Sequence, residues 1–215
     1  MPVHEVRQGE HLARIIRQYG FTDPDFVWGQ SANQPLREQG RTPSTLAPGD
    51  LVTIPERAAK TLGKSTDQRH RLRVKQRTYR LHLVLRDAEG RPAANLPCIL
   101  RVGAADQALT TTSDGSLQAD IPADLESADV TVGQGNSSLS GARFVVLIGH
   151  LDPVELITGQ EARLNNLGFR AGTSGDSSAP VFRSAVEEFQ SQHGLGVDGI
   201  CGPQTQRKLV QIHGC

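Results

Sequence analysis

The sequence predicts an α+β chain of several small domains: a strand–helix–helix–strand unit, a small β-sandwich and a three-helix bundle. Apolar residues spaced i, i+3, i+4, i+7 near both ends of the chain predict amphipathic helices. A middle region of short apolar stretches separated by Gly- and Pro-containing turns predicts strands. The 215 residues are 37% apolar and only 4% aromatic, with 22 Gly and 12 Pro. This composition favours several small cores over one large core.

These patterns divide the chain into four predicted segments. Residues 1–56 form the first unit, residues 57–78 a basic linker that enters a strand, residues 79–150 the β-sandwich and residues 151–215 the helical bundle. Alternation of basic and apolar residues from Arg71 to Arg77 gives way to an apolar set of opposite phase that starts at Tyr79. Such a change of phase predicts a bulge or a break near residues 76–78.

The first unit has clear signals for its ends and weaker ones between them. Val3 to Arg7 and Leu51 to Pro55 are expected to be its two strands. A helical face predicts the first helix, which ends at Gly20, and Asp23-Pro24 is a typical helix start. The residues of that face are Leu12, Ile15, Ile16 and Tyr19. Residues 34–44 are expected to be a polar loop.

Three motifs of this unit, at residues 6–12, 15–20 and 46–55, resemble a LysM domain. The resemblance implies a βααβ fold that binds N-acetylglucosamine-containing glycans such as peptidoglycan and chitin. The groove candidates that it implies are Gly9, Glu10, His11, Leu12, Leu46, Pro48, Gly49 and Asp50. Glu10-His11 replaces the usual Asp-Thr of the family, and an insertion at residues 34–41 adjoins the groove. Turn formation alone also explains Gly9, Pro48 and Gly49.

The middle segment is predicted to form five or six short strands. Those expected are residues 81–85, 98–102, 110–112, 116–122, 128–132 and 143–148. Asp114-Gly115 predicts a hairpin between two of them. Strands at this spacing predict a small sandwich, and the turn pattern resembles transthyretin-like and immunoglobulin-like domains.

The last segment predicts a bundle with a helix from Pro180 whose inward face holds Phe182, Ala185, Val186 and Phe189. A final helix from Pro203 is expected to turn Thr205, Leu209 and Ile212 inward. The motifs at residues 160–169, 185–195 and 197–209 closely resemble the three-helix peptidoglycan-binding domain of many cell-wall hydrolases. Gln190 and Asp198 are the ligand-facing candidates of this unit, although Asp198 is equally well explained as the cap of its own turn.

Charge is balanced overall and uneven locally. Lys plus Arg and Asp plus Glu are both 23, which excludes a wholly basic nucleic-acid binder. Nine basic residues and one acid lie between Arg57 and Arg80, whereas six acids and no Lys or Arg lie between Val102 and Ala142. We expect these two segments to neutralise each other; the alternative is a site for an anionic polymer or an acidic partner. No segment is apolar enough to span a membrane.

Catalytic motifs are not recognised in the segment that is free to hold them. Cys98 lies in an apolar strand and is expected to be a small buried thiol. His82, His150 and Asp152 match no recognised zinc motif, and the acids show no arrangement typical of a glycosidase. The sequence therefore predicts no catalytic residue, metal site or cofactor.

Together the patterns favour a non-catalytic peptidoglycan-binding protein that tethers or positions an associated effector or injection machine at the cell wall. The whole chain resembles LysM and peptidoglycan-binding accessory proteins of bacterial contractile injection loci, including a Gly-His-Leu-Asp-Pro stretch at residues 149–153. That resemblance implies a spike or effector partner, synthesis in the cytoplasm without a signal peptide, and delivery to the wall by the machine. Two alternatives stay open: an adaptor that binds proteins through the same modules, and a wall hydrolase or toxin with an unrecognised active site.

Overall fold

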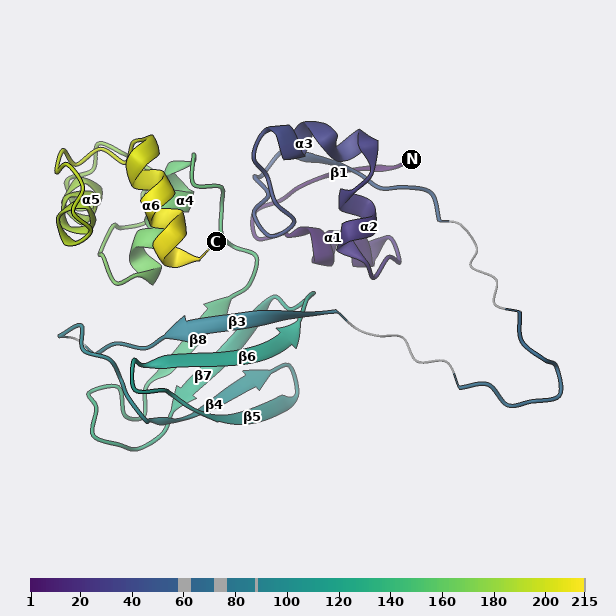
Figure 1. Cartoon of the computed structure of the whole chain (residues 1–215), viewed down its shortest axis with the longest axis horizontal. Coiled ribbons are helices and arrows are strands. Elements are labelled where there is room, and N and C mark those ends of the chain that lie inside the picture. The colour runs from purple at the N-terminus through teal and green to yellow at the C-terminus, as the bar shows by residue number, and fades with distance from the viewer. Residues whose placement is uncertain (58–62, 72–76, 88, 215) are drawn as a thin grey trace.

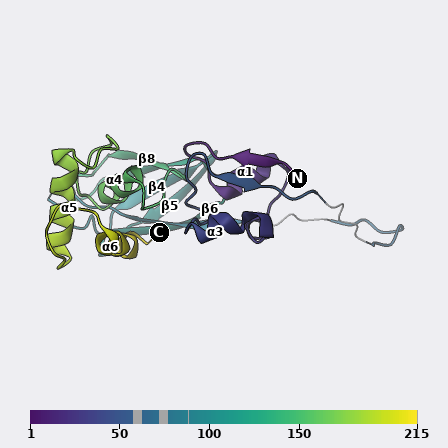
Figure 2. The same cartoon turned by 90° about the horizontal axis from the view of Figure 1, so that it is seen from above.

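The computed structural model describes residues 1–57, 63–71, 77–87 and 89–214. It is a mixed α/β structure with antiparallel sheets, in which a small N-terminal unit and a helical C-terminal unit lie side by side over a β unit (Figures 1 and 2). Each unit has its own cluster of buried apolar side chains. None of the helices in the described ranges is both long and apolar enough to cross a membrane.

The N-terminal unit (residues 1–56) joins its two ends in a short antiparallel pair. In that pair β1 (Val3–Glu5) is hydrogen-bonded to β2 (Leu51–Thr53). The elements between them are α1 (Leu12–Gln18), α2 (Pro24–Trp28), the 3₁₀ turn η1 (Ser31–Asn33) and α3 (Gln34–Glu38). The buried Asn33 side chain donates to Val27 O and Thr53 O, both at 2.9 Å, and so joins α2 to β2.

The helix signals of this unit are confirmed, and the loop prediction is wrong in part. The Asp23 carboxylate accepts the Asp25 N–H at the start of α2, and Gly20, with φ +76°, follows the end of α1. Residues 34–38 are a helix and not a loop, since Pro35 lies in the first turn, where its missing N–H costs nothing, and Leu36 enters the core.

The β unit (residues 77–148) encloses its core between two sheets. One sheet pairs β3 (Thr78–Val84) with β6 (Ser116–Pro122), and the other has the order β5-β4-β7-β8. Its strands are β4 (Pro97–Val102), β5 (Ala105–Thr110), β7 (Ser127–Val132) and β8 (Arg143–Leu147). The predicted apolar set of β3, from Tyr79 to Leu85, packs against this core. The predicted alternation at residues 71–77 and the predicted break near residues 76–78 fall in part on residues 72–76, which are outside the described residues.

Two predictions in this unit are wrong. The third strand is residues 105–110 and not 110–112, because the tight turn at residues 103–104 pairs it with β4. Asp114-Gly115 makes no hairpin: it forms a turn from β5 to β6, which belong to different sheets. Gly115 is required there, because a Cβ would lie 2.5 Å from Leu85 O.

The C-terminal unit (residues 151–214) is a three-helix arrangement of α4 (Ile157–Asn166), α5 (Pro180–Gln192) and α6 (Pro203–His213). The predicted inward face of α5 is fully buried, and Phe189 meets Phe169 edge to face at 5.4 Å between ring centroids. Thr205 and Leu209 of α6 are buried as expected. Ile212 is 40% exposed, because it lies in the last turn of α6, beyond the core.

Candidate functional site

The first predicted groove loop, residues 9–12, is held in place by the carboxylate of Glu10. The Glu10 carboxylate accepts the Arg7 N–H at 3.0 Å and lies 2.8 Å from His4 Nε2. Burial opposes ionisation of Glu10, but the hydrogen bonds from His4 and from the Arg7 backbone outweigh it and lower the pKa of this carboxyl group. Leu12 points into the core and is 0% exposed. Glu10 therefore stabilises the conformation of this loop through its own hydrogen bonds.

The other predicted groove loop, residues 46–50, is a turn that Asp50 closes. Its carboxylate accepts the Ala47 N–H at 2.8 Å and the Arg41 Nε–H at 3.0 Å. Gly49 takes φ +89° and donates its N–H to Val6 O, which holds this turn against the residue that follows β1. Pro48 and Gly49 are exposed, and Leu46 is buried.

The remainder of the chain covers the first loop. His11 is 2% exposed, and its Nε2–H donates to Ala123 O of the β unit at 2.7 Å. The His150 ring lies on Gly9, where a Cβ would come within 2.4 Å of it; likewise a Cβ on Gly149 would come within 2.2 Å of His11. Burial lowers the pKa of His11, so the ring is held neutral against the β unit.

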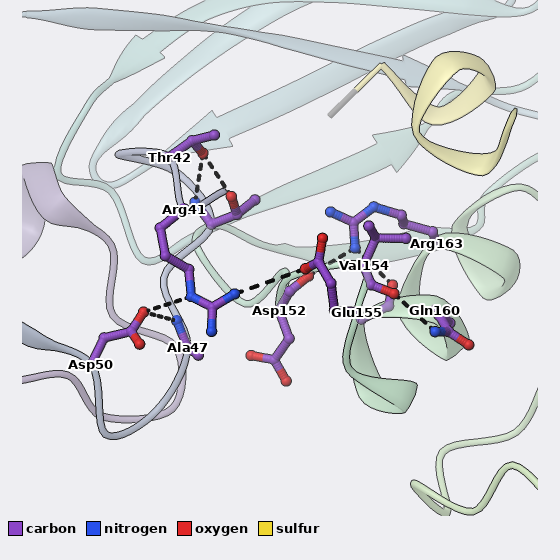
Figure 3. Close-up of polar contacts among 11 residues, drawn as sticks. Arg41, Thr42, Ala47, Asp50, Asp152, Val154, Glu155, Gln160 and Arg163 are labelled. Atoms are coloured by element: carbon purple, nitrogen blue, oxygen red, sulfur yellow. Dashed lines mark hydrogen bonds and ion pairs between the residues drawn. The ribbon is translucent and has the colours of Figure 1, made fainter. Parts of the chain in front are cut away.

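A polar seam joins the second loop to the C-terminal unit (Figure 3). Arg41, which holds Asp50, also lies 3.8 Å from the carboxylate of Glu155. Asp152 accepts from Gln8 of the N-terminal unit at 3.2 Å and from Thr158 of α4 at 2.6 Å. Its backbone oxygen accepts from Arg163 at 2.7 Å. The seam therefore fixes the two end units relative to each other.

The structure thus separates the eight predicted groove residues into two groups. The closed group is Gly9, His11, Leu12 and Leu46. Pro48 and Gly49 are open to solvent, and Glu10 and Asp50 are partly so. The glycan groove stays a prediction, and its fully exposed residues, Pro48 and Gly49, lie in the second loop. Sequence reasoning missed the seam residues Arg41 and Glu155. The one sequence signal for this seam was the stretch at residues 149–153, which includes Asp152.

In the C-terminal unit, Gln190 and Asp198 are brought together but have different surroundings. Gln190 is 1% exposed; its amide nitrogen lies 2.8 Å from Asp198 Oδ1 and its oxygen accepts the N–H groups of Asp198 and Gly199. Asp198 is exposed and caps Ile200 N–H, and this bond, with that from Gln190, lowers the pKa of its carboxyl group. Gln190 therefore positions the loop, whereas Asp198 and the exposed Val197 and Ile200 form its surface.

Of the groups considered for catalysis, Cys98, His150 and Asp152 lie in structural contacts, whereas His82 is exposed on β3. Cys98 is 2% exposed, and burial raises the pKa of its thiol; burial likewise raises the pKa of Cys201 to about 12. Asp152 and His150 belong to the contacts between units. Within the described ranges, no three His, Cys, Asp or Glu residues are grouped so as to hold a metal ion.

Residues 159–209, which run from α4 into α6, match the family described as "Putative peptidoglycan binding domain". The C-terminal region contains a peptidoglycan-binding domain. The N-acetylmuramoyl-L-alanine amidase CwlM of Mycobacterium tuberculosis is 41% identical over 49 residues, which are 23% of this chain and 12% of the relative. The chain therefore spans about an eighth of that relative's length. No solved structure matches the chain.

The peptidoglycan-binding domain includes Gln190 and Asp198 and excludes the whole N-terminal unit. The residues that match this family begin at Gly159, a few positions after Asp152 and Glu155 of the seam. A Cβ at Gly159 would lie 2.1 Å from Pro153 O. This close approach lets Arg163 donate to both Asp152 O and Gly159 O. The domain is thereby fastened to the stretch that covers the N-terminal unit.

Proposed function

We propose that this chain is a non-catalytic peptidoglycan-binding protein that positions an associated effector or injection machine at the cell wall. The observation that carries the proposal is the peptidoglycan-binding domain at residues 159–209. Its exposed loop offers two apolar side chains, Val197 and Ile200, which flank Asp198 in the sequence. Exposed apolar groups beside hydrogen-bonding groups are typical of a ligand surface.

The N-terminal unit contributes a second, glycan-binding surface in this proposal. Its order of strand, helices and closing strand and its Pro48-Gly49 turn support a LysM-type unit that recognises N-acetylglucosamine. The seam through Asp152 holds this unit beside the peptidoglycan-binding domain. Two weak surfaces in a fixed orientation bind one polymer more tightly than either does alone, provided that one strand reaches both.

Co-sedimentation of the full chain with purified sacculi tests the proposal. Ile200→Asp places a charge on the exposed loop and is expected to weaken binding about tenfold, the cost of losing one apolar contact. Ile99→Asp is the matched control, because Ile99 is also exposed but lies on the β unit. Wild-type protein that stays in the supernatant, or equal losses in both variants, would contradict the proposal.

The glycan surface is tested in the same assay. Gly49→Asn puts a side chain over the exposed turn in a left-handed conformation that asparagine tolerates, with nothing within 4 Å to displace. Gly103→Asn is its control, because Gly103 has φ +59° and equally open surroundings in the β unit. We expect only Gly49→Asn to weaken binding.

The absence of catalysis is part of the proposal and has its own measurement. Purified protein incubated with sacculi is expected to release no soluble muropeptides, and Cys98→Ala is expected to change nothing, because that thiol is buried. Release of fragments would support the alternative of a wall hydrolase. Delivery by an injection machine predicts that the chain reaches the periplasm only in cells with an intact machine.

A further inference from the structure

The acids of the β unit are neutralised mostly by arginines from outside the basic segment at residues 57–80. Six acids lie between Val102 and Ala142, and five of them pair with arginine. These pairs are Asp106 with Arg101, Asp120 with Arg80, Asp124 with Arg17, Glu126 with Arg14 and Asp129 with Arg143. Of those five arginines, Arg80 alone belongs to the basic segment. The sixth acid, Asp114, accepts the Ser116 N–H of its own turn at 3.0 Å.

The basic segment therefore keeps positive charge that its acidic counterpart does not offset. Its Arg77 and Arg80 pair with aspartates. Among the residues that the structure describes, four other basic side chains of this segment are exposed and form no ion pair: Arg57, Lys64, Arg69 and Arg71. Three of the four lie in residues 63–71, the basic loop, which is exposed throughout and lies apart from the three units (Figure 1).

A hydrogen bond within the basic loop separates its charges. The His70 Nε2–H donates to Ser65 O at 2.8 Å and closes a turn between these two residues. Asp67, the one acid of the loop, lies on that turn. Lys64 precedes the closing contact and Arg71 follows it, so the basic residues lie on the two arms of the loop. Both arms therefore present positive charge to solvent.

The residue types of the basic loop indicate the kind of anion that it binds. Arginine binds the oxygens of phosphate or carboxylate groups in pairs, through a guanidinium that stays charged at any physiological pH. Residues 63–71 contain no large apolar side chain that could insert into a lipid bilayer. They contain no Phe, Tyr or Trp on which bases stack, and they form no helix or strand that could enter a groove of a duplex. These features favour a flexible anionic polymer over a membrane or a nucleic acid.

We propose that the basic loop binds a flexible anionic polymer of the cell wall, whose phosphate or carboxylate charges repeat along its chain. The choice of a wall polymer rests on the function proposed above, and the site adds a charged ligand to the peptidoglycan surfaces of that function. A polymer with repeated charges contacts Lys64, Arg69 and Arg71 at once, which a single small anion does not. Arg57, at the end of the N-terminal unit, extends the same positive surface.

Fluorescence anisotropy of labelled poly(glycerol phosphate) with the full-length protein tests the site. Each charge contact with a flexible strand contributes about −0.7 to the slope of log affinity against log salt concentration, so four contacts predict a slope of about −3. Binding should therefore weaken about fiftyfold between about 50 and 200 mM salt. Polygalacturonate, which carries carboxylates, shows in the same assay which of the two charges the loop prefers.

Three results of this assay would overturn the proposal. The first is that neither polymer binds at the lower salt concentration. The second is that duplex DNA binds as tightly as the preferred polymer at equal charge, which would assign the loop to nucleic acid. The third is that phosphatidylglycerol vesicles do so, which would assign it to a membrane surface.

Paired variants then locate the site. Arg69→Gln/Arg71→Gln removes two exposed charges and is expected to weaken polymer binding about tenfold and to reduce the salt slope by about 1.4. Arg170→Gln/Arg183→Gln is the matched control, because it removes the same charge from two exposed positions of the C-terminal unit for which the described residues provide no ion pair. We expect the control to leave polymer binding unchanged. Equal losses in both variants would show that net charge, and not the basic loop, binds the polymer.

Sacculi stripped of attached anionic polymers separate this site from the proposed function. The wild type and Arg69→Gln/Arg71→Gln should sediment with stripped sacculi equally, since the basic loop does not contact peptidoglycan itself. A loss in the variant would contradict the assignment of the loop to a separate polymer. Failure of the wild type to sediment would contradict the proposed function, whereas the binding of poly(glycerol phosphate) is measured without sacculi.

Discussion

Single residues at positions 9, 11 and 150 decide how closely the N-terminal unit fits the rest of the chain. Gly9 leaves room for the His150 ring, and His11 reaches the backbone of the β unit. The sequence showed Gly9 and His11 as parts of a loop, and its motif implied that they face a glycan. Their burial could not be predicted, because the residues that cover them are more than 100 positions away in the chain.

His11 should make the stability of the protein depend on pH. Burial, with Tyr79 nearby, lowers the pKa of His11 from 6.5, and Arg14 and His150 lower it further; the hydrogen bond to Ala123 O and the Asp124 carboxylate oppose them. Below pH 6.5 the unfolded chain binds a proton that the folded chain does not. The stabilisation is therefore complete above pH 6.5 and is lost as the pH falls towards the folded pKa, by at most about 1.4 kcal/mol per pH unit.

Urea unfolding between pH 5 and pH 8 measures this dependence. His11→Gln keeps a donor for Ala123 O and does not titrate, so it should show a smaller slope than the wild type. His193, whose pKa is also lowered by burial, contributes to the slope in the same pH range, and His193→Gln measures its share as a control. If His11→Gln and the wild type have equal slopes, His11 is not held neutral.

A methyl group at position 9 should cost more than the same group at position 49. Both glycines have positive φ, +81° and +89°, so alanine is strained by about 1–2 kcal/mol at either. A Cβ at Gly9 also comes within 2.4 Å of His150, whereas Gly49 has nothing within 4 Å. We expect Gly9→Ala to lower the free energy of unfolding by about 1–3 kcal/mol more than Gly49→Ala. Adding His150→Ala should remove that excess; if the excess persists, the His150 contact is not its cause.

At the scale of elements, sequence patterns were reliable where a signal was local. The cap at Asp23 and the left-handed Gly20 lie within one turn of the helices that they bound, and the buried face of α5 repeats at helical spacing. Local signals failed where the structure depends on which strands pair with each other. Asp114-Gly115 has the residues of a hairpin, but its two strands hydrogen-bond to different neighbours, a choice made by the whole β unit.

Phe189 of α5 provides the sharpest test of how independent the helical unit is. The side chain is 0% exposed and packs edge to face on Phe169, so Phe189→Ala should destabilise the C-terminal unit by about 3–5 kcal/mol. Val181→Ala, at an exposed position of the same helix, should change stability by less than about 0.5 kcal/mol.

Two optical probes separate the units in this experiment. Trp28, the one tryptophan of the chain, packs against the core of the N-terminal unit, so its fluorescence follows that unit alone. Far-ultraviolet circular dichroism follows the longer helices of the C-terminal unit. In Phe189→Ala the dichroism transition should move to lower urea by much more than the Trp28 transition. Equal displacement of both would mean that the units unfold as one.

At the scale of the whole molecule, charge pairs join segments that the sequence did not connect. Among the residues that the structure describes, the basic and acidic segments form an ion pair at Arg80 and Asp120. The acidic turn after β6 pairs instead with α1, through Asp124 and Glu126, and Arg77 turns to the N-terminal unit. Composition predicted an excess of each sign, but not the partners, because these follow from the docking of separate cores. Most of these pairs are exposed and contribute little to stability individually.

Asp152, in contrast, is 7% exposed and joins both end units, so its replacement should release them. Asp152→Ala leaves Gln8 and Thr158 without their acceptor, at a cost of about 1–3 kcal/mol to the docked arrangement. The three cores do not include Asp152 and should remain folded. Small-angle X-ray scattering should therefore show a larger radius of gyration with an unchanged dichroism spectrum.

Asp176→Ala is the control for this release, because Asp176 caps only its own loop through Ser178. If the fixed orientation of the end units contributes to wall binding, Asp152→Ala should also weaken sacculus binding, whereas Asp176→Ala should not. A larger radius of gyration with unchanged sacculus binding would show that the wall-binding surfaces act separately. An unchanged radius of gyration would mean that Arg41 and the contacts of His11 hold the units together without Asp152, because these contacts survive the substitution.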